Sequence, residues 1–267
     1  MKTYFSYFLL KFKVGLQYRA AAWAGILTQI FFGFIFAFVY LAFYESNNTT
    51  GPIEIRRLIS YVWLVQAFYA MIYLYHRDKE IIGNIKNGNI SYELVRPQNL
   101  YAMWFSRILG DKLSSVVLRF LPVLIIASIL PIDYRLDLSI TLTRFVIFIP
   151  ALILAAILIV SFIVLMHIVV MFTLDERGVI VIFITIADVL AGTEIPLPFF
   201  PKILRDISNF LPFRYMTDFP FRFYVGDISI HDGLTSILVQ LVWIIILVVL
   251  GKLLMRKALK NAVVQGG

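Results

Sequence analysis

Residues 145–172 read FVIFIPALILAAILIVSFIVLMHIVVMF and contain no lysine, arginine, aspartate or glutamate. An α-helix rises about 1.5 Å per residue, so this stretch is longer than the roughly 30 Å hydrocarbon core of a bilayer. A charge-free run of this length is typical of a transmembrane helix. The rest of the chain is therefore interpreted as part of a membrane protein.

The composition of the whole chain agrees with that interpretation. Of its 267 residues, 61% are hydrophobic and 15% are charged, whereas soluble domains contain about 45–50% apolar and about 25% charged residues. The net charge of +8 would suggest nucleic acid in a soluble protein, but here it is attributed to basic residues retained on the cytoplasmic side. We therefore expect membrane lipid, and no nucleic acid, among the partners. The absence of cysteine excludes disulfides and thiolate metal sites.

Apolar runs recur on both sides of this stretch and predict an all-α, polytopic protein in which residues 1–267 form one transmembrane domain. The six expected spans are 21–44, 58–75, 113–130, 145–172, 178–191 and 234–250. The fifth run is shorter than the roughly 20 residues that a crossing needs, and it contains Asp188. It predicts a helix that breaks, or re-enters, near the membrane surface. Residues 3–19 combine aromatic residues at helical spacing with lysines, which favours an amphipathic interfacial helix over a simple lead-in to the first span.

The basic residues predict the orientation. Fifteen of the 24 fall on the face that holds both termini and eight on the other, with Arg119 left inside the third span. By the positive-inside rule the richer face is cytoplasmic. Both termini and the polar loop 76–112 are then cytoplasmic, and the Pro-rich region 192–232 is external.

Two loop segments resemble those of a known family. Residues 83–97, GNIKNGNISYELVRP, are similar to the coupling-helix region of type-2 ABC exporter permeases, and residues 192–204, GTEIPLPFFPKIL, are similar to the external re-entrant helices of that family. Together with the order of the spans, they make the chain resemble a compact bacterial branch that is often encoded as two unlike permease subunits.

The resemblance implies a bacterial plasma membrane protein that moves a drug, peptide, lipid or lipid-linked glycan outward. A second permease, identical or unlike, would complete the path, and two P-loop ATPase subunits would bind ATP and Mg. This chain would bind no cofactor and would not be an enzyme, since it lacks the G-x-x-x-x-G-K-[ST] phosphate loop: Gly251-Lys252 is its only Gly-Lys pair and lies at the end of a span.

Two groups of candidate site residues follow. In the cytoplasmic loop, apolar side chains would fill a cleft on the ATPase while polar ones contact its rim; the alternative is a loop helix that packs on its own bundle. These coupling residues are Ile90, Tyr92, Glu93, Leu94, Val95 and Arg96. In the external region, residues 192–210 are expected to form two short helical arms around a Pro-rich turn, either capping the path or serving as a structural lid. The pathway residues there are Asp188, Glu194, Pro196, Pro198, Phe199, Phe200 and Pro201.

Two polar residues within the spans have competing interpretations. Arg119 either lines the pathway or extends to the cytoplasmic interface. His167, beside Met166 and near Met171, suggests a metal site, but a lone histidine without clustered partners favours a packed or hydrogen-bonded span residue. We expect no metal site and no catalytic residue. A secondary transporter would show inverted repeats, and a membrane enzyme or scaffold would need a catalytic constellation; neither feature is found in the sequence.

Overall fold

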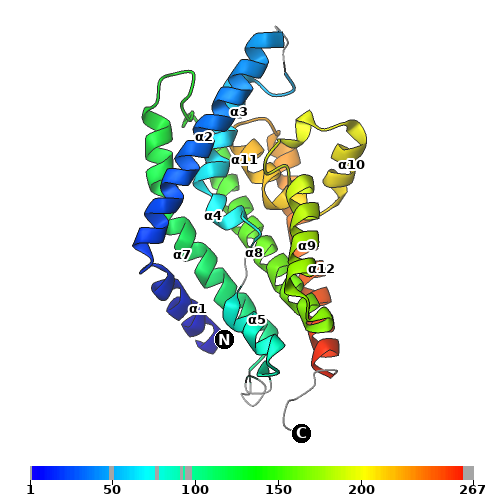
Figure 1. Cartoon of the computed structure of the whole chain (residues 1–267). Helices are drawn as coiled ribbons and strands as arrows, with labels where there is room; N and C mark the ends of the chain where they lie inside the picture. Colours follow the sequence, from blue (N-terminus) through cyan, green and yellow to red (C-terminus); the bar gives the residue numbers. More distant parts are fainter. Residues whose placement is uncertain (1, 48–50, 76–77, 91–92, 94–97, 261–267) are drawn as a thin grey trace.

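The computed structural model describes residues 2–47, 51–75, 78–90, 93 and 98–260. Within these ranges the regular structure is entirely helical, which confirms the expected all-α class. Four helices are long and apolar enough to cross a membrane: α2 (Arg19–Asn47), α7 (Leu100–Ile129), α8 (Leu142–Thr173) and α12 (Ile230–Lys260). They run side by side along one axis, and both termini lie at the same end of the bundle (Figure 1).

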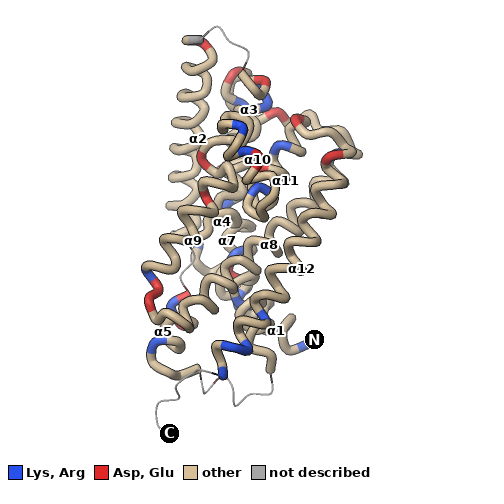
Figure 2. Tube along the Cα trace, turned by 90° about the vertical axis from the view of Figure 1, so that its right-hand side faces the viewer, with Lys and Arg blue, Asp and Glu red and all other residues tan. Residues whose placement is uncertain are grey.

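Helix α8 is the centre of the bundle. Its second half is almost completely buried, and it packs most extensively against α12. The Ser161 hydroxyl donates to the Ile157 carbonyl oxygen (2.8 Å), so this buried polar group is satisfied within the helix. The charged residues lie mainly toward the two ends of the bundle, whereas long stretches of α8 and α12 carry none (Figure 2).

The second predicted span, 58–75, is divided in the structure. It consists of α3 (Ile55–Ala67) and the short α4 (Tyr69–Ile72), separated at Phe68, and the helix ends before residue 75. The Lys112 ammonium group, from α7, donates to the carbonyl oxygens of Ala70 (3.4 Å) and Tyr73. These carbonyl groups near the end of α4 are therefore satisfied by a side chain instead of by another helical turn.

The third predicted span begins too late. Helix α7 starts at Leu100 and not near residue 113, because Asn99 caps it by accepting from the Ala102 amide (3.0 Å). The prediction placed the boundary after the charged residues Arg107, Asp111 and Lys112, but these are accommodated within one continuous helix. The predicted loop 76–112 is therefore partly α7 and partly α5 (Lys79–Lys86).

The predicted interfacial helix 3–19 is α1 (Lys2–Gly15), which ends earlier because the chain turns between Gly15 and α2. Helix α1 packs along α7. The approach is close at Gly110, where an added Cβ would lie 2.8 Å from the Phe8 carbonyl oxygen. The first half of α7 therefore carries α1 as a second layer.

The fifth predicted span is α9 (Glu176–Ala191), which is followed by a series of short elements at the end opposite the termini (Figure 1). These are η1 (Leu197–Phe199), α10 (Lys202–Phe210), η2 (Phe213–Met216) and α11 (Asp218–Tyr224). Of the two helical arms expected within residues 192–210, one is the helix α10, and the other is only the three-residue 3-10 turn η1.

Gly192 makes the turn out of α9 possible, and its replacement provides a test of this region. Its φ is +70°, and an added Cβ would lie 3.0 Å from Leu197 Cγ. We expect Gly192→Ala to destabilise the protein by about 1–2 kcal/mol, because a non-glycine residue is strained in the left-handed region. Thermal unfolding in detergent measures this, with Gly83→Ala as control, because an added Cβ there meets no atom within 4 Å. Equal stability of the two variants would contradict the assigned turn.

Candidate functional site

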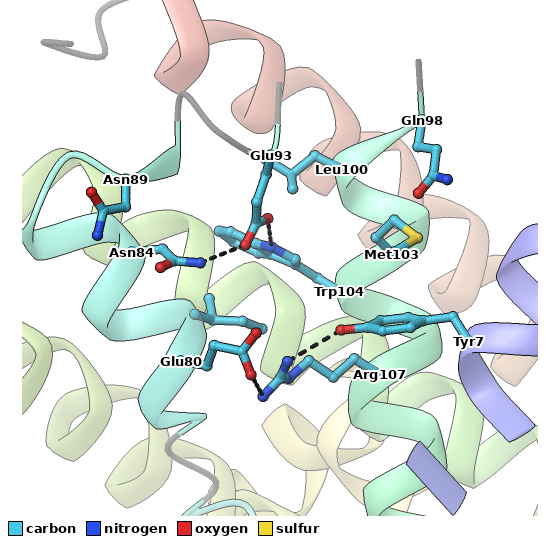
Figure 3. Close-up of a pocket in the computed structure, with 11 residues that line it drawn as sticks. Tyr7, Glu80, Asn84, Asn89, Glu93, Gln98, Leu100, Met103, Trp104 and Arg107 are labelled. Atoms are coloured by element: carbon cyan, nitrogen blue, oxygen red, sulfur yellow. Dashed lines mark hydrogen bonds and ion pairs between the residues drawn. The ribbon is translucent and has the colours of Figure 1, made fainter. Parts of the chain in front are cut away.

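A polar cavity of about 300 Å³ lies at the end of the bundle that holds the termini, between α1, α5 and the start of α7 (Figure 3). Its lining comes from α1, from α5 and the loop after it, and from the segment that begins α7: Tyr7, Glu80, Ile81, Asn84, Asn89, Glu93, Gln98, Leu100, Met103, Trp104 and Arg107. The cavity therefore lies where the N-terminal helix, the predicted coupling loop and a long helix meet.

Helix α5 forms one wall, and its sequence explains its position. Asp78 caps the helix, because its Oδ1 accepts from the amides of Glu80 and Ile81 (both 3.0 Å). The isoleucines on one face, Ile81, Ile82 and Ile85, are buried. On another side, an added Cβ at Gly83 would meet no atom of the described part of the chain within 4 Å. One face of α5 is therefore packed on the bundle, and Gly83 marks an open side.

Arg107 joins three segments at the bottom of this cavity. Its Nε pairs with Asp78, its Nη2 lies 2.6 Å from Glu80 Oε2, and its Nη1 donates to the Tyr7 hydroxyl (3.1 Å). Figure 3 shows the Arg107 side chain lying between Glu80 and Tyr7. Arg107 and Asp78 are only 9% and 6% exposed. We call Tyr7, Asp78, Glu80 and Arg107 the Arg107 cluster.

Burial raises the pKa of the Tyr7 hydroxyl, although the neighbouring Arg107 opposes this shift. Tyr7 therefore stays protonated at neutral pH, and its oxygen accepts from Arg107 as a neutral group. The cluster then consists of one guanidinium, two carboxylates and one phenol. It fixes α1 and the cap of α5 to the same side chain of α7.

His167 extends the cluster to α8. Its Nε2 accepts from the Asp78 amide (3.3 Å), and its Nδ1 lies 2.8 Å from the Ile163 carbonyl oxygen. These partners assign the hydrogen to Nδ1 and make His167 a hydrogen-bonded residue of the bundle. Among the described residues no group of three or more His, Asp or Glu is placed to hold a metal ion.

The far end of α5 is also held in place. Lys86 Nζ lies 3.5 Å from Glu176 Oε1, at the first residue of α9. Helix α5 is therefore connected to α7 and α8 at its start and to α9 at its end. A force applied to α5 would be transmitted to several helices through these contacts.

The structure describes two of the six predicted coupling residues, and both side chains point into this chain. Ile90 is 5% exposed and belongs to the hydrophobic core. Glu93 accepts from the Asn84 amide (2.6 Å) and from the Trp104 indole (3.2 Å), as Figure 3 shows. The other four, Tyr92, Leu94, Val95 and Arg96, lie outside the described residues.

The predicted pathway residues lie far from this cavity, around the end of α9 and the segment after it. The Asp188 and Glu194 carboxylates are near enough to interact electrostatically. The Tyr40 hydroxyl donates to the Glu194 carbonyl oxygen (3.2 Å), and the Phe199 ring lies 5.8 Å from the Tyr40 ring. Pro196 is buried, Pro198 and Phe200 are half-buried, and Pro201 is exposed just before α10.

Asp218 holds this external segment in place. It is completely buried, pairs with Arg222 (3.1 Å) and Arg214 (3.6 Å), and accepts from the Leu197 amide (3.3 Å). The Tyr61 hydroxyl of α3 donates to the Gly192 carbonyl oxygen (3.1 Å). Residues 192–201 are therefore tied to α2, α3 and α11.

The contacts of Arg107, Lys112 and Tyr7 are not predicted by the sequence. Arg107 and Lys112 were assigned to a loop, and Tyr7 to an interfacial helix, although all three make contacts between helices. Arg119 Nε is buried and has no hydrogen-bond partner among the described residues, and its guanidinium lies against Gly25 of α2. One feature of the sequence indicates part of the Arg107 cluster. Asp78 stands directly before a short amphipathic helix, a position typical of an N-cap.

Comparisons with known proteins establish the family. A search of curated proteins found no match. The family model described as "ABC-2 family transporter protein" matches residues 30–266, which is most of the chain. This range includes α7, α8, α12, α5, the external elements and the part of α2 from residue 30 onward. The chain therefore belongs to the ABC-2 transporter family and is a multi-pass membrane permease, a transport component that is not itself catalytic.

Proposed function

We propose that this chain is the permease subunit of an ATP-driven exporter and that α5, with the segment after it, is where a separate ATPase docks. The observation that carries the proposal is that contacts with other helices fix both ends of α5. The Arg107 cluster and the Lys86–Glu176 pair hold both of its ends, while no described residue covers the side at Gly83. A rigidly held element with an open side is suited to receive a partner's motion and pass it to α7, α8 and α9.

Docking then involves different side chains from those expected from the sequence. Ile90 and Glu93 stabilise the loop from inside, and the surface offered to the ATPase is formed by exposed residues of α5 and the turn after it: Lys79, Lys86, Asn87 and Asn89. Tyr92 and Leu94 remain candidates for the apolar part of this surface. Two ATPase subunits, with ATP and Mg, would serve two permeases.

We propose six crossings, made by the four long helices together with α3–α4 and α9. In Figure 1 these shorter helices run alongside the long ones. With both termini cytoplasmic, the Arg107 cluster faces the ATPase and the α10 region faces outward, in a bacterial plasma membrane. Outward transport of a hydrophobic or amphipathic substrate would use a path shared with a second permease, with Asp188, Glu194 and Phe199 near its outer end.

Cysteine labelling tests this orientation. The chain has no native cysteine, so a variant with one introduced cysteine has a single reactive site. We expect cysteines replacing Asp137 or Lys202 to react with an impermeant thiol reagent in intact cells, and those replacing Asn87 or Lys260 to react only after permeabilisation. All four positions are exposed. Labelling of Asn87→Cys from outside would reverse the orientation.

Affinity purification of the tagged protein in mild detergent tests the function. We expect a P-loop ATPase to co-purify. Its reproducible absence would favour a secondary transporter, or a membrane enzyme or scaffold, over an ATP-driven permease.

A further inference from the structure

A second cavity, of about 190 Å³, lies between the start of α7 and the last turns of α12. It is lined by Gln98, Asn99, Leu100, Tyr101, Lys252, Met255, Arg256 and Leu259. Gln98 and Leu100 line this cavity and the one beside the Arg107 cluster. The two cavities are thus neighbours across the segment that leads into α7. We call this second one the α7–α12 cavity.

The charged residues of the α7–α12 cavity are all basic. Lys252 and Arg256 lie one turn apart on α12, so their side chains share a face of the helix. None of the described lining residues is acidic, and neither cation forms an ion pair or hydrogen bond with another described residue. Gln98 and Asn99 add neutral amide groups opposite them. Two neighbouring cations with no acidic partner among the described residues favour a ligand with several anionic oxygens, such as a phosphate group.

The other walls are apolar. Tyr101 and Met255 are 4% and 3% exposed, and Leu100 and Leu259 complete the lining. From Lys252 toward the middle of α12, the side chains of Val249 and Ile245 are exposed. A basic opening, apolar walls and an adjoining apolar helix surface match a lipid better than a free ion. The volume is below the roughly 300–1,000 Å³ of pockets that enclose whole drug-sized ligands, so the cavity would hold a headgroup while the acyl chains lie along α12.

We propose that the α7–α12 cavity binds the phosphate headgroup of an acidic phospholipid, such as phosphatidylglycerol. Basic pockets between transmembrane helices on the cytoplasmic side are suited to such headgroups. The proposal requires that α7 and α12 lie in a membrane, but it does not depend on ATPase docking or on the direction of transport. A lipid bound there would contact Gln98 and Leu100 and so support the start of α7 beside the Arg107 cluster.

Titration of detergent-solubilised protein with phosphatidylglycerol, read by native mass spectrometry, tests this site. We compare K252Q/R256Q with K257Q/K260Q, which removes the same charge from exposed positions that do not line the cavity. The contact of one exposed cation with a phosphate group contributes up to roughly a factor of five in affinity, and among the described basic residues only Lys252 and Arg256 line the cavity. We therefore expect up to about 25-fold weaker binding for K252Q/R256Q and a much smaller change for K257Q/K260Q. The charge-conserving variant K252R/R256K should bind nearly as well as the unmodified protein.

Three outcomes would overturn the proposal. Equal weakening in both glutamine variants would mean that general charge, and not this cavity, attracts the lipid. Displacement of the lipid by inorganic phosphate at similar concentration would identify a free-anion site. Equal affinity for phosphatidylcholine and phosphatidylglycerol would show that the net negative charge of the lipid does not contribute to binding. If K252Q/R256Q does not yield folded protein, K252Q and R256Q are titrated singly, and each is expected to bind up to about fivefold more weakly.

Discussion

Arg107→Ala is expected to abolish ATP-driven transport and to destabilise the protein by about 3–5 kcal/mol, because it breaks the ion pair between Arg107 and the buried Asp78 carboxylate. The same change removes the hydrogen bond to Tyr7 in α1 and one of the ion pairs of Glu80 in α5, which also pairs with Lys11. Thermal unfolding of the purified protein and transport by reconstituted complexes measure the two effects. Arg177→Ala is the matched control, since Arg177 is an exposed arginine at the start of α9.

A second substitution separates two effects of Arg107→Ala: the loss of the cation beside Asp78, and the loss of the contact between α5 and α7. Asp78→Asn in the Arg107→Ala background removes the buried negative charge that Arg107 pairs with, but retains a good helix cap. We expect this double variant to be more stable than Arg107→Ala alone, while transport remains impaired because α5 is no longer held by α7. If Arg107→Ala were as stable and as active as Arg177→Ala, the Arg107 cluster would have no role in holding α5.

Gly83→Trp is expected to weaken the association with the ATPase at least about fivefold and to leave the permease folded. An added Cβ at Gly83 meets no atom of the described residues within 4 Å, so we expect a large side chain there to project away from the bundle. Filling a packed interface with an oversized side chain costs roughly 1–3 kcal/mol. Co-purification of the ATPase with equal amounts of each variant gives the measurement.

Gly83→Ala is the control for this experiment. It removes the same backbone flexibility within α5 and adds almost no bulk, so it should retain the ATPase and slightly stabilise the helix. Undiminished co-purification with Gly83→Trp would show that this side of α5 is not the docking surface. Loss of the ATPase from both variants would point to an effect of the α5 backbone instead of a steric block.

The long helices could be predicted from the sequence because a continuous apolar run such as residues 145–172 is typical of a transmembrane helix. The interruption at Phe68 could not be predicted, because neither proline nor glycine marks it. The side chain that satisfies the carbonyl oxygens beyond it belongs to Lys112, about forty positions away. The start of α7 was missed for a related reason: Arg107 and Lys112 seemed to indicate a loop, but contacts with other helices make them buried residues of a continuous helix.

The candidate site was predicted less well than the fold. The sequence identified the loop but not the Arg107 cluster, since Arg107 contacts Asp78 29 positions away and Tyr7 100 positions away. Glu93 was expected at the rim of an interface, and its pairing with Trp104 turns it inward. Local patterns show which residues are polar, but the packing of α1 and α5 on α7 decides which of them meet.

The central claim is that a separate ATPase docks on α5 and the turn that follows it, and cross-linking tests it most directly. A single cysteine replacing Asn87, at the end of α5, is coupled to a photoreactive reagent in native membranes, and its adducts are identified by mass spectrometry. A cysteine replacing Lys202, at the opposite end of the bundle, serves as the control. The account predicts a P-loop ATPase adduct from Asn87→Cys and none from Lys202→Cys. An ATPase adduct from Lys202→Cys, or none from Asn87→Cys in membranes that contain the assembled complex, would contradict it.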